Sequence, residues 1–269
     1  FEPMSDTAAT AAAAAATAPR TTPHQLPLTR DKMRVPPYTT DEYTTLLLHM
    51  EGDDGSYTFV DDSGKRHNAS SSANITSSVS KVGQSSAYFD RSPATRILVP
   101  KSDDWLFDGD FTVDLWFMYA ADADPKPHTQ GDVMLGTFVN SKENGGGQGI
   151  TLGAYDSARG IPFCDPGDQE HRGSALVFQG HTGNNHDSNF KEYGKVFGVS
   201  KVTPGEWHHY AVARSSGTIY VFLDGGLEAM KTVASGKCET DYEYPGLELA
   251  IGGTPDGART FHGWIDELR

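Results

Sequence analysis

The sequence has few basic residues, no long apolar run and no sustained helical periodicity, and each shortage excludes a class of protein. No apolar run approaches the roughly 18 residues that a membrane-spanning helix needs, so we expect no membrane span. The 22 basic residues against 36 acidic ones give a formal net charge of −14, which would repel nucleic acid and anionic lipid surfaces. We therefore predict no nucleic-acid partner. The acidic surface is compatible with a divalent cation, although such charge mostly serves solvation.

Cysteine is also scarce, and what the two cysteines do depends on the compartment. Cys164 and Cys238 both lie in loop-like surroundings, so they could form one disulfide in an oxidising compartment or stay as two thiols. Asn68-Ala-Ser70 and Asn74-Ile-Thr76 match the N-glycosylation pattern, which is relevant only on a secretory route. No secretory signal is visible at the N-terminus, which is also the state left after a signal is removed.

Residues 1–43 have the composition of an arm rather than of a core. They combine a polyalanine run with threonine and repeated proline, and proline stops a helix from extending. We predict an extended arm or linker that becomes ordered only against something else, such as neighbouring subunits of a larger assembly. The folded domain is predicted to span residues 44–269.

The segment Trp207–Gly225 carries the clearest structural signal in the domain. Two strand-like runs, WHHYAVAR and TIYVFLD, are joined by Ser215-Ser216-Gly217, whose glycine can adopt a positive φ. Because neither face of either run is strongly polar, we expect this β-hairpin to lie inside a layered β structure. His208 and His209 are adjacent on a strand, so their side chains point to opposite faces and should pack rather than share a metal ion.

Further strand-like segments occur along the rest of the domain, about eleven in total, and no convincing amphipathic helix accompanies them. The connections are too short for parallel crossovers, so we predict an all-β fold, a two-sheet antiparallel sandwich. Three unpatterned loops, at 140–149, 155–173 and 180–198, are long enough to suggest a function. The other predicted strands are 44–49, 86–90, 95–99, 111–117, 132–139, 149–152, 174–179, 247–251 and 261–269.

Six phrases in this order resemble a laminin-G-like domain of the concanavalin A-like superfamily: LLLHMEGDDGSYTFVDDSG, KVGQSSAYFDRS, ILVPKSDDWLFDGDFTVDLWF, EWHHYAVARSSGTIYVFLDG, LAIGG and FHGWIDELR. The resemblance covers roughly Thr44 to Arg269. It implies a jelly roll in which the first and last strands are adjacent, with ligands bound at loops or on a concave face and catalysis only in certain relatives. Modules with this opening recur in virion and tail-fibre proteins and in secreted surface proteins. The alanine-proline arm has no counterpart in the family pattern.

The resemblance also implies a structural calcium ion where the first and last strands meet. The matching positions are Glu51 and Asp266, with a backbone carbonyl near Gly83 as a third contributor and Asp53 or Asp54 adding charge. Calcium prefers six to eight oxygen ligands, which these groups supply in part. The ion would staple the chain ends. The alternative is that these are solvated carboxylates.

Aromatic side chains and polar loops offer candidate glycan-binding groups. The aromatic candidates are Trp105, Trp116, Tyr155, Phe190 and Tyr193, although Trp116 sits within a strand and is expected in the core. The loop GHTGNNHDSNF (180–190) carries amides and imidazoles that can bond sugar hydroxyls. The predicted ligand-binding residues are His181, Asn184, Asn185, His186 and Tyr193.

One motif raises the possibility of catalysis. Glu239, Asp241 and Glu243 have the E-x-D-x-E spacing of retaining glycosidases of this superfamily, in which alternate residues share one strand face. Here the motif lies beside Cys238 and Pro245 in a connector, which favours an acidic loop.

We therefore predict a non-catalytic structural or adhesive module of an extracellular or virion assembly, binding a glycan or protein partner through its loops. The alternatives are a free carbohydrate-binding lectin and a glycoside hydrolase or polysaccharide lyase of the same superfamily.

Overall fold

Fourteen strands and one short 3-10 turn make up the regular structure of the computed structural model. All pairings between the strands are antiparallel. The structure describes residues 35–105, 107, 109–121, 132–138, 147–156, 174–180, 195–197, 200, 202–232, 247–257 and 259–269.

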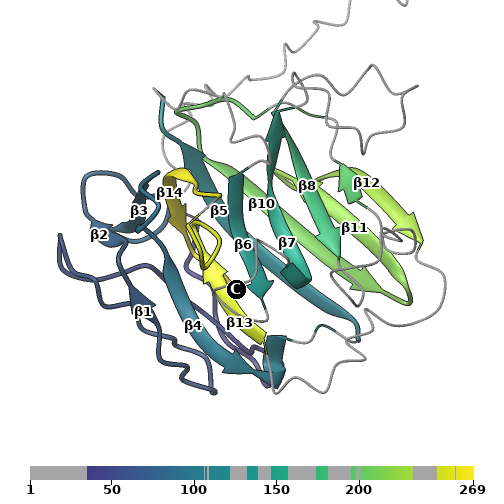
Figure 1. The fold of residues 1–269 in the computed structure, drawn as a ribbon, viewed down its shortest axis with the longest axis horizontal. Coiled ribbons are helices and arrows are strands. Elements are labelled where there is room, and N and C mark those ends of the chain that lie inside the picture. The colour runs from purple at the N-terminus through teal and green to yellow at the C-terminus, as the bar shows by residue number, and fades with distance from the viewer. Residues whose placement is uncertain are drawn as a thin grey trace, which may run out of the picture. The chain divides into compact units, whose positions relative to one another are not determined.

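The strands form two seven-stranded sheets (Figure 1). The first sheet has the order β1 (Ser70–Ser71), β4 (Ile97–Ser102), β13 (Leu247–Ile251), β6 (Asp132–Phe138), β7 (Gly147–Asp156), β8 (Ser174–Gly180) and β9 (Lys195–Phe197). The second has the order β12 (Gly226–Thr232), β11 (Thr218–Leu223), β10 (His208–Ser215), β5 (Phe111–Tyr119), β14 (His262–Asp266), β3 (Ser86–Asp90) and β2 (Asn74–Thr76). The 3-10 turn η1 spans Asp103–Trp105. The predicted two-sheet antiparallel sandwich is confirmed.

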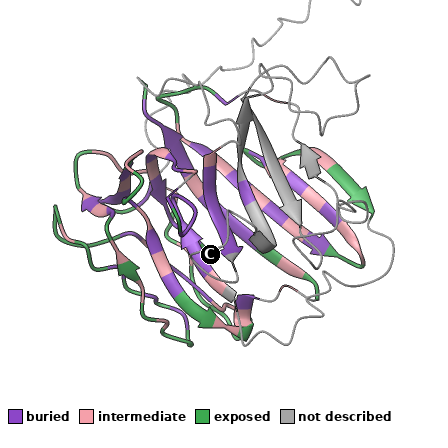
Figure 2. Cartoon of the chain, in the orientation of Figure 1, coloured by how far each residue is buried: buried purple, intermediate pink, exposed green. Residues whose placement is uncertain are grey.

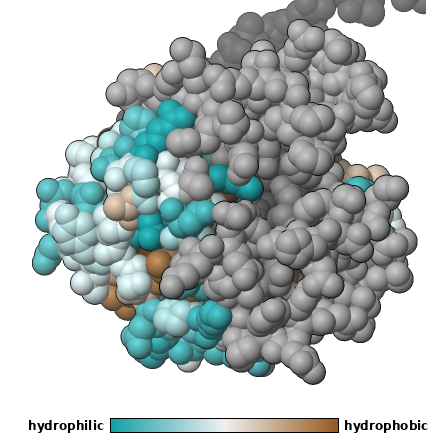
Figure 3. Space-filling view, in the orientation of Figure 1, coloured by the Kyte–Doolittle hydropathy of each residue, from teal (hydrophilic) through white to brown (hydrophobic). Residues whose placement is uncertain are grey.

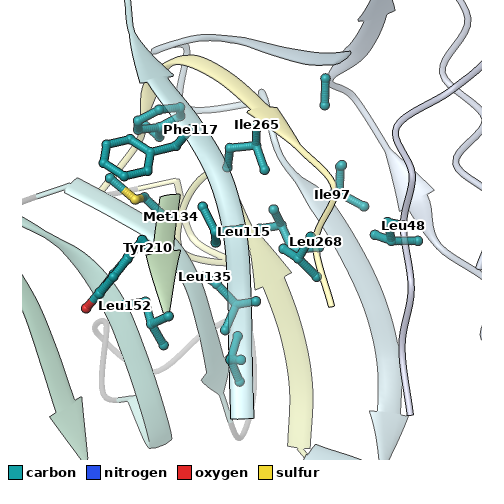
Figure 4. Close-up of a cluster of buried hydrophobic side chains, with 14 of the residues drawn as sticks. Leu48, Ile97, Leu115, Phe117, Met134, Leu135, Leu152, Tyr210, Ile265 and Leu268 are labelled. Atoms are coloured by element: carbon teal, nitrogen blue, oxygen red, sulfur yellow. The ribbon is translucent and has the colours of Figure 1, made fainter. Parts of the chain in front are cut away.

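The core lies between the two sheets and follows the period-2 pattern of the strands. On β10 and β11 the residues alternate strictly between buried and half-buried positions, as Figure 2 shows. The inward side chains of β5 and β10, among them Leu115, Phe117 and Tyr210, belong to the same buried cluster as Met134 and Leu152 of the first sheet (Figure 4). Burying such a side chain contributes roughly 1.5–3 kcal/mol, so this alternation stabilises the sandwich.

The predicted hairpin is confirmed, with a tighter turn than expected. Ser215 still pairs with Thr218, so the connection is the two residues Ser216-Gly217. Their φ angles of 49° and 77° are both positive, as a two-residue turn of the type I′ kind requires. Both strands lie inside the second sheet, but their outer faces are half-buried rather than covered.

Two parts of the strand prediction were wrong. Residues 44–49 do not form a strand ladder: Leu48 makes isolated bridges to Leu268 and Asp61, and the amide of Leu47 donates to the Asp61 side chain instead of to a neighbouring strand. Strands β1, β2, β9 and β12 were missed. Three of them span only two or three residues, and β12 lies at the edge of its sheet, where the burial that creates an alternating pattern is lacking.

A polar group is buried at the start of β6. Burial raises the pKa of Asp132 from 3.8 to about 6, although the positive charge of Arg91 opposes this. The Asp132 Oδ1 atom has no protein hydrogen-bond partner, and the same holds for the buried hydroxyls of Tyr119 and Tyr210. The charge of Asp132 in turn adds to the burial that raises the pKa of Tyr119.

This burial predicts a pH-dependent stability that Asp132→Asn should reduce. Since the folded-state pKa lies above the ordinary value, the stabilising contribution of protonated Asp132 is complete below about pH 4 and is lost as the pH rises through about 6. Denaturant unfolding at about pH 4.5 and about pH 7.5 should therefore show a larger loss of stability in the wild type than in the variant. Equal losses in the two proteins would contradict the assignment.

Candidate functional site

The first candidate site is the junction where the chain enters and leaves the sandwich. Leu48 and Leu268 exchange two backbone hydrogen bonds, with N···O distances of 2.8 and 3.0 Å. Figure 4 shows both side chains directed into the core beside Ile97. The predicted adjacency of the first and last segments is confirmed, and it brings Glu51 and Asp266 to the same end of the molecule.

These two carboxylates hold one loop between them. Asp266 Oδ2 accepts hydrogen bonds from the amides of Lys81 and Val82, at 2.8 and 2.9 Å. Glu51 Oε1 accepts from the amides of Gln84 and Ser85, at 2.8 and 3.4 Å. The loop 81–85 is thus bonded at its start by the last strand and at its end by the first segment.

Gly83 lies at the centre of that loop, and its size matters. Its φ angle is 56°, and a Cβ atom at this position would overlap the Glu51 carboxylate. The carboxylate therefore packs directly on the Gly83 backbone, so the structure brings together all three residues that the sequence proposed for calcium. Asp54 is engaged elsewhere, because its carboxylate accepts from the Ser77 amide at 2.8 Å.

The junction has the donor chemistry of a cation site. Asp266 is fully buried and its Oδ1 atom has no protein partner. Burial raises the pKa of Asp266 to about 7, and the negative charges of Glu267 and Glu51 add to the effect. Within the described ranges, no three His, Cys, Asp or Glu side chains cluster tightly enough to hold a metal by themselves. A bound ion would therefore take its remaining oxygens from backbone carbonyls and water, as calcium commonly does.

The second candidate site is a pocket on the outer face of the second sheet, the face that points away from the first sheet. Trp116 on β5 lies opposite His209 on β10, with ring centroids 5.0 Å apart. The segment carrying Val35 and Tyr38 lies against these rings, and it belongs to the same compact unit as the sandwich. The pocket has a volume of about 420 Å³ and is lined by Val35, Tyr38, Asp114, Trp116, His209, Asp224 and Gly225.

Tyr38 is fixed in place by the end of the chain. Its amide donates to Glu267 Oε2 at 2.8 Å, and its hydroxyl lies 2.9 Å from His209 Nε2. The Arg269 guanidinium lies 4.6 Å from the centre of the Tyr38 ring, a cation–π contact. Burial, assisted by the negative charge of Asp114, raises the pKa of Tyr38, so its hydroxyl stays neutral.

The charged groups of the pocket are paired. Asp114 Oδ2 lies 3.1 Å from Arg269 Nη2. Asp224 accepts from the His209 amide through one oxygen and contacts His208 Nδ1 through the other, both at 2.8 Å. Burial raises the pKa of Asp114 and lowers that of His209, so the His209 imidazole is neutral at neutral pH.

Two polar atoms of the pocket residues remain without a protein partner, Trp116 Nε1 and Asp114 Oδ1. Asp114 is only 7% exposed, so its free oxygen is not solvated as a surface carboxylate would be. Buried polar groups normally have a hydrogen-bond partner. The pocket therefore contains one unused donor and one unused acceptor.

The structure corrects two aromatic predictions. Trp116, expected in the core, is half-buried on the outer face. Trp105, proposed as an exposed platform, is 2% exposed, and its Nε1 donates to the Pro100 carbonyl at 3.0 Å. The opposite orientation of the two histidines is confirmed, since His208 contacts Phe117 of the core and His209 contacts Trp116.

The period of β5 already indicated this pocket. If Val113, Leu115 and Phe117 face the core, then Asp114 and Trp116 must share the opposite face. No comparable signal exists for Tyr38, which lies in the segment assigned to the arm.

Other predicted residues cannot be placed in this geometry. Of the glycosylation candidates, Asn68 is exposed and Asn74 lies half-buried on β2. For Tyr155, on β7, only the backbone is described. The predictions that fall outside the described residues are His181, Asn184, Asn185, His186, Phe190, Tyr193, Glu239, Asp241, Glu243, Cys164, Cys238 and the arm 1–34.

Comparison with known proteins establishes the family. The model of the concanavalin A-like lectin/glucanases superfamily, laminin-G type, matches residues 93–269, which is more than half of the chain. The chain belongs to this superfamily. A search of curated proteins finds no match.

Several solved structures share the fold. The binding domain of botulinum neurotoxin DC has been solved in complex with SialylT (TM-score 0.50, 12% identity) and with rat synaptotagmin II (TM-score 0.50, 11% identity). In both, the match covers 83% of this chain and 46% of that domain, so the chain spans about half of its length. Domain 4 of a GH43 extracellular arabinanase from Geobacillus stearothermophilus, in complex with arabinotriose, matches over 84% of this chain and 90% of that one (TM-score 0.49, 16% identity).

Within the described ranges, the structure contains no helix with the length and apolar character of a membrane span. The part of the surface coloured in Figure 3 is mostly hydrophilic, in keeping with the acidic composition.

Proposed function

We propose that this protein is a non-catalytic binding module of an extracellular assembly that engages a glycan or a protein surface. One observation carries the proposal: the pocket combines a half-buried aromatic ring with unused hydrogen-bonding atoms, while its carboxylates are committed to structural partners. Acid–base catalysis of glycoside hydrolysis needs two carboxyl groups free to exchange protons with substrate. Fixed hydrogen-bonding groups beside an aromatic ring suit binding instead.

The neurotoxin binding domains support both kinds of partner. They have the same fold, and their complexes contain SialylT in one case and a protein, rat synaptotagmin II, in the other. Engagement through the 180–190 loop and docking of the arm onto neighbouring subunits are further parts of the proposal, as is a virion or fibre setting. A free carbohydrate-binding lectin remains the alternative within the same class of function.

A structural calcium ion at the chain-end junction is part of the same proposal. Glu51, Asp266 and the Gly83 carbonyl would hold it, and the unpartnered Asp266 Oδ1 supports this assignment. When bound, calcium supplies positive charge that offsets two neighbouring carboxylates and joins the entry of the chain to its last strand.

The test separates binding from turnover. The purified full chain is applied to an array of neutral and charged oligosaccharides with calcium present, and the retained glycans are eluted and their masses measured. We expect retained glycans to be recovered intact. Recovery of shortened or unsaturated oligosaccharides would contradict the proposal and favour the glycoside hydrolase or polysaccharide lyase alternative.

A further inference from the structure

The two unused atoms of the outer-face pocket define what a ligand must offer there. An indole N–H can only donate a hydrogen bond and a carboxylate oxygen can only accept one, so Trp116 Nε1 and Asp114 Oδ1 need opposite partners. A hydroxyl group does both. Asp114 and Trp116 are alternate residues of β5, so they project from the same face of the strand, roughly 7 Å apart. Neighbouring hydroxyls on one small ring can span such a separation.

The charges around the pocket favour a neutral ligand. Arg269 pairs with Asp114, and the Lys81 ammonium lies 4.2 Å from the centre of the Trp116 ring, so an incoming cation would meet two positive charges. An incoming anion would meet the carboxylates of Asp114 and Asp224. A neutral molecule with many hydroxyls avoids both repulsions and still satisfies the unused atoms.

The walls of the pocket suit the C–H faces of a sugar ring. Val35 and the rings of Tyr38 and Trp116 supply apolar surface, and the Tyr38 hydroxyl, held by His209, adds a polar group beside it. The volume of about 420 Å³ lies within the range of roughly 300–1,000 Å³ typical of small-ligand pockets.

We propose that this pocket binds a neutral saccharide unit, with Trp116 Nε1 donating to one hydroxyl and Asp114 Oδ1 accepting from another. The inference rests on the proposed binding function but assigns it to the outer face of the second sheet, where β5, β10 and the segment 35–38 meet. It is independent of the 180–190 loop.

The test uses Trp116→Phe, which removes the indole N–H and keeps an aromatic ring. The matched control is Trp264→Phe, on the neighbouring strand β14, because Trp264 is also half-buried but packs on Tyr88, with ring centroids 5.2 Å apart, and does not line the pocket. The full chain, labelled with ¹⁵N, is titrated with neutral gluco-, galacto-, manno-, xylo- and arabino-oligosaccharides and with sialylated and sulfated ones. The indole N–H resonances of the four tryptophans are followed by NMR.

We expect at least one neutral oligosaccharide to shift the Trp116 indole resonance, which is identified by its absence in Trp116→Phe. Its affinity should fall about tenfold or more in Trp116→Phe and stay unchanged in Trp264→Phe. If Trp116→Phe does not fold, the indole shift in the wild type and a weakened affinity in Tyr38→Phe provide the same test.

Two outcomes would overturn the inference. If an oligosaccharide binds the wild type and Trp116→Phe equally, glycan binding occurs elsewhere, and the proposed function stands without this site. If only charged glycans bind, or none of the neutral ones shifts the Trp116 resonance, the pocket is not a saccharide site.

Discussion

Chelation of calcium is expected to lower the midpoint of thermal unfolding of the full chain by roughly 5–10 °C. A ligand present at a hundredfold excess over its dissociation constant, and bound only by the folded state, stabilises that state by about 2.7 kcal/mol. For a chain of this size, each kcal/mol corresponds to roughly 2–4 °C. Unfolding would be followed by calorimetry, first with calcium and then with a chelator.

The junction residues allow a sharp variant of this experiment. Asp266→Asn keeps an oxygen that can accept the Lys81 and Val82 amides but removes the negative charge that a cation needs. We expect the variant to unfold at the same temperature with and without calcium. Asp90→Asn is the matched control, because Asp90 also accepts a backbone amide, that of Ser92 at 2.8 Å, but lies away from the junction. It should keep the full response to calcium.

The result decides between the two interpretations of the junction. A wild type that responds as Asp266→Asn does would mean that the amides of the 81–85 loop alone satisfy these carboxylates, and that no cation is held there. A response that survives in Asp266→Asn would place the calcium elsewhere in the chain.

The fold was largely predictable because its signals are local. Alternating runs such as 111–117 and the Ser216-Gly217 turn encode strand and turn geometry within a few residues. The sites depend on contacts that are remote in sequence, and local patterns do not report these. Glu51 and Asp266 could be paired only through the family resemblance, and Tyr38 reaches Glu267 across 229 positions. Thus the outer-face pocket was half visible: β5 announced Asp114 and Trp116, but nothing announced the segment that covers them.

Glycines show the same limit, and one pair of them gives a strong prediction. Gly252 and Gly55 have nearly the same positive φ, 78° and 80°, so alanine at either position carries a similar backbone strain of about 1–2 kcal/mol. Their surroundings differ: a Cβ on Gly252 would overlap the Phe89 ring, whereas a Cβ on Gly55 would meet nothing within 4 Å. Phe89 is fully buried and packs on Phe261, with ring centroids 6.0 Å apart, so it has no room to move.

Gly252→Ala should therefore lower the free energy of unfolding by roughly 2–5 kcal/mol, since overpacking adds about 1–3 kcal/mol to the backbone strain. Gly55→Ala should show only the strain, about 1–2 kcal/mol. Denaturant unfolding of both variants measures the difference, and equal losses would mean that Phe89 can shift in the sandwich core. The expected difference comes entirely from the partner across the core, because the sequence presents both positions simply as turn glycines.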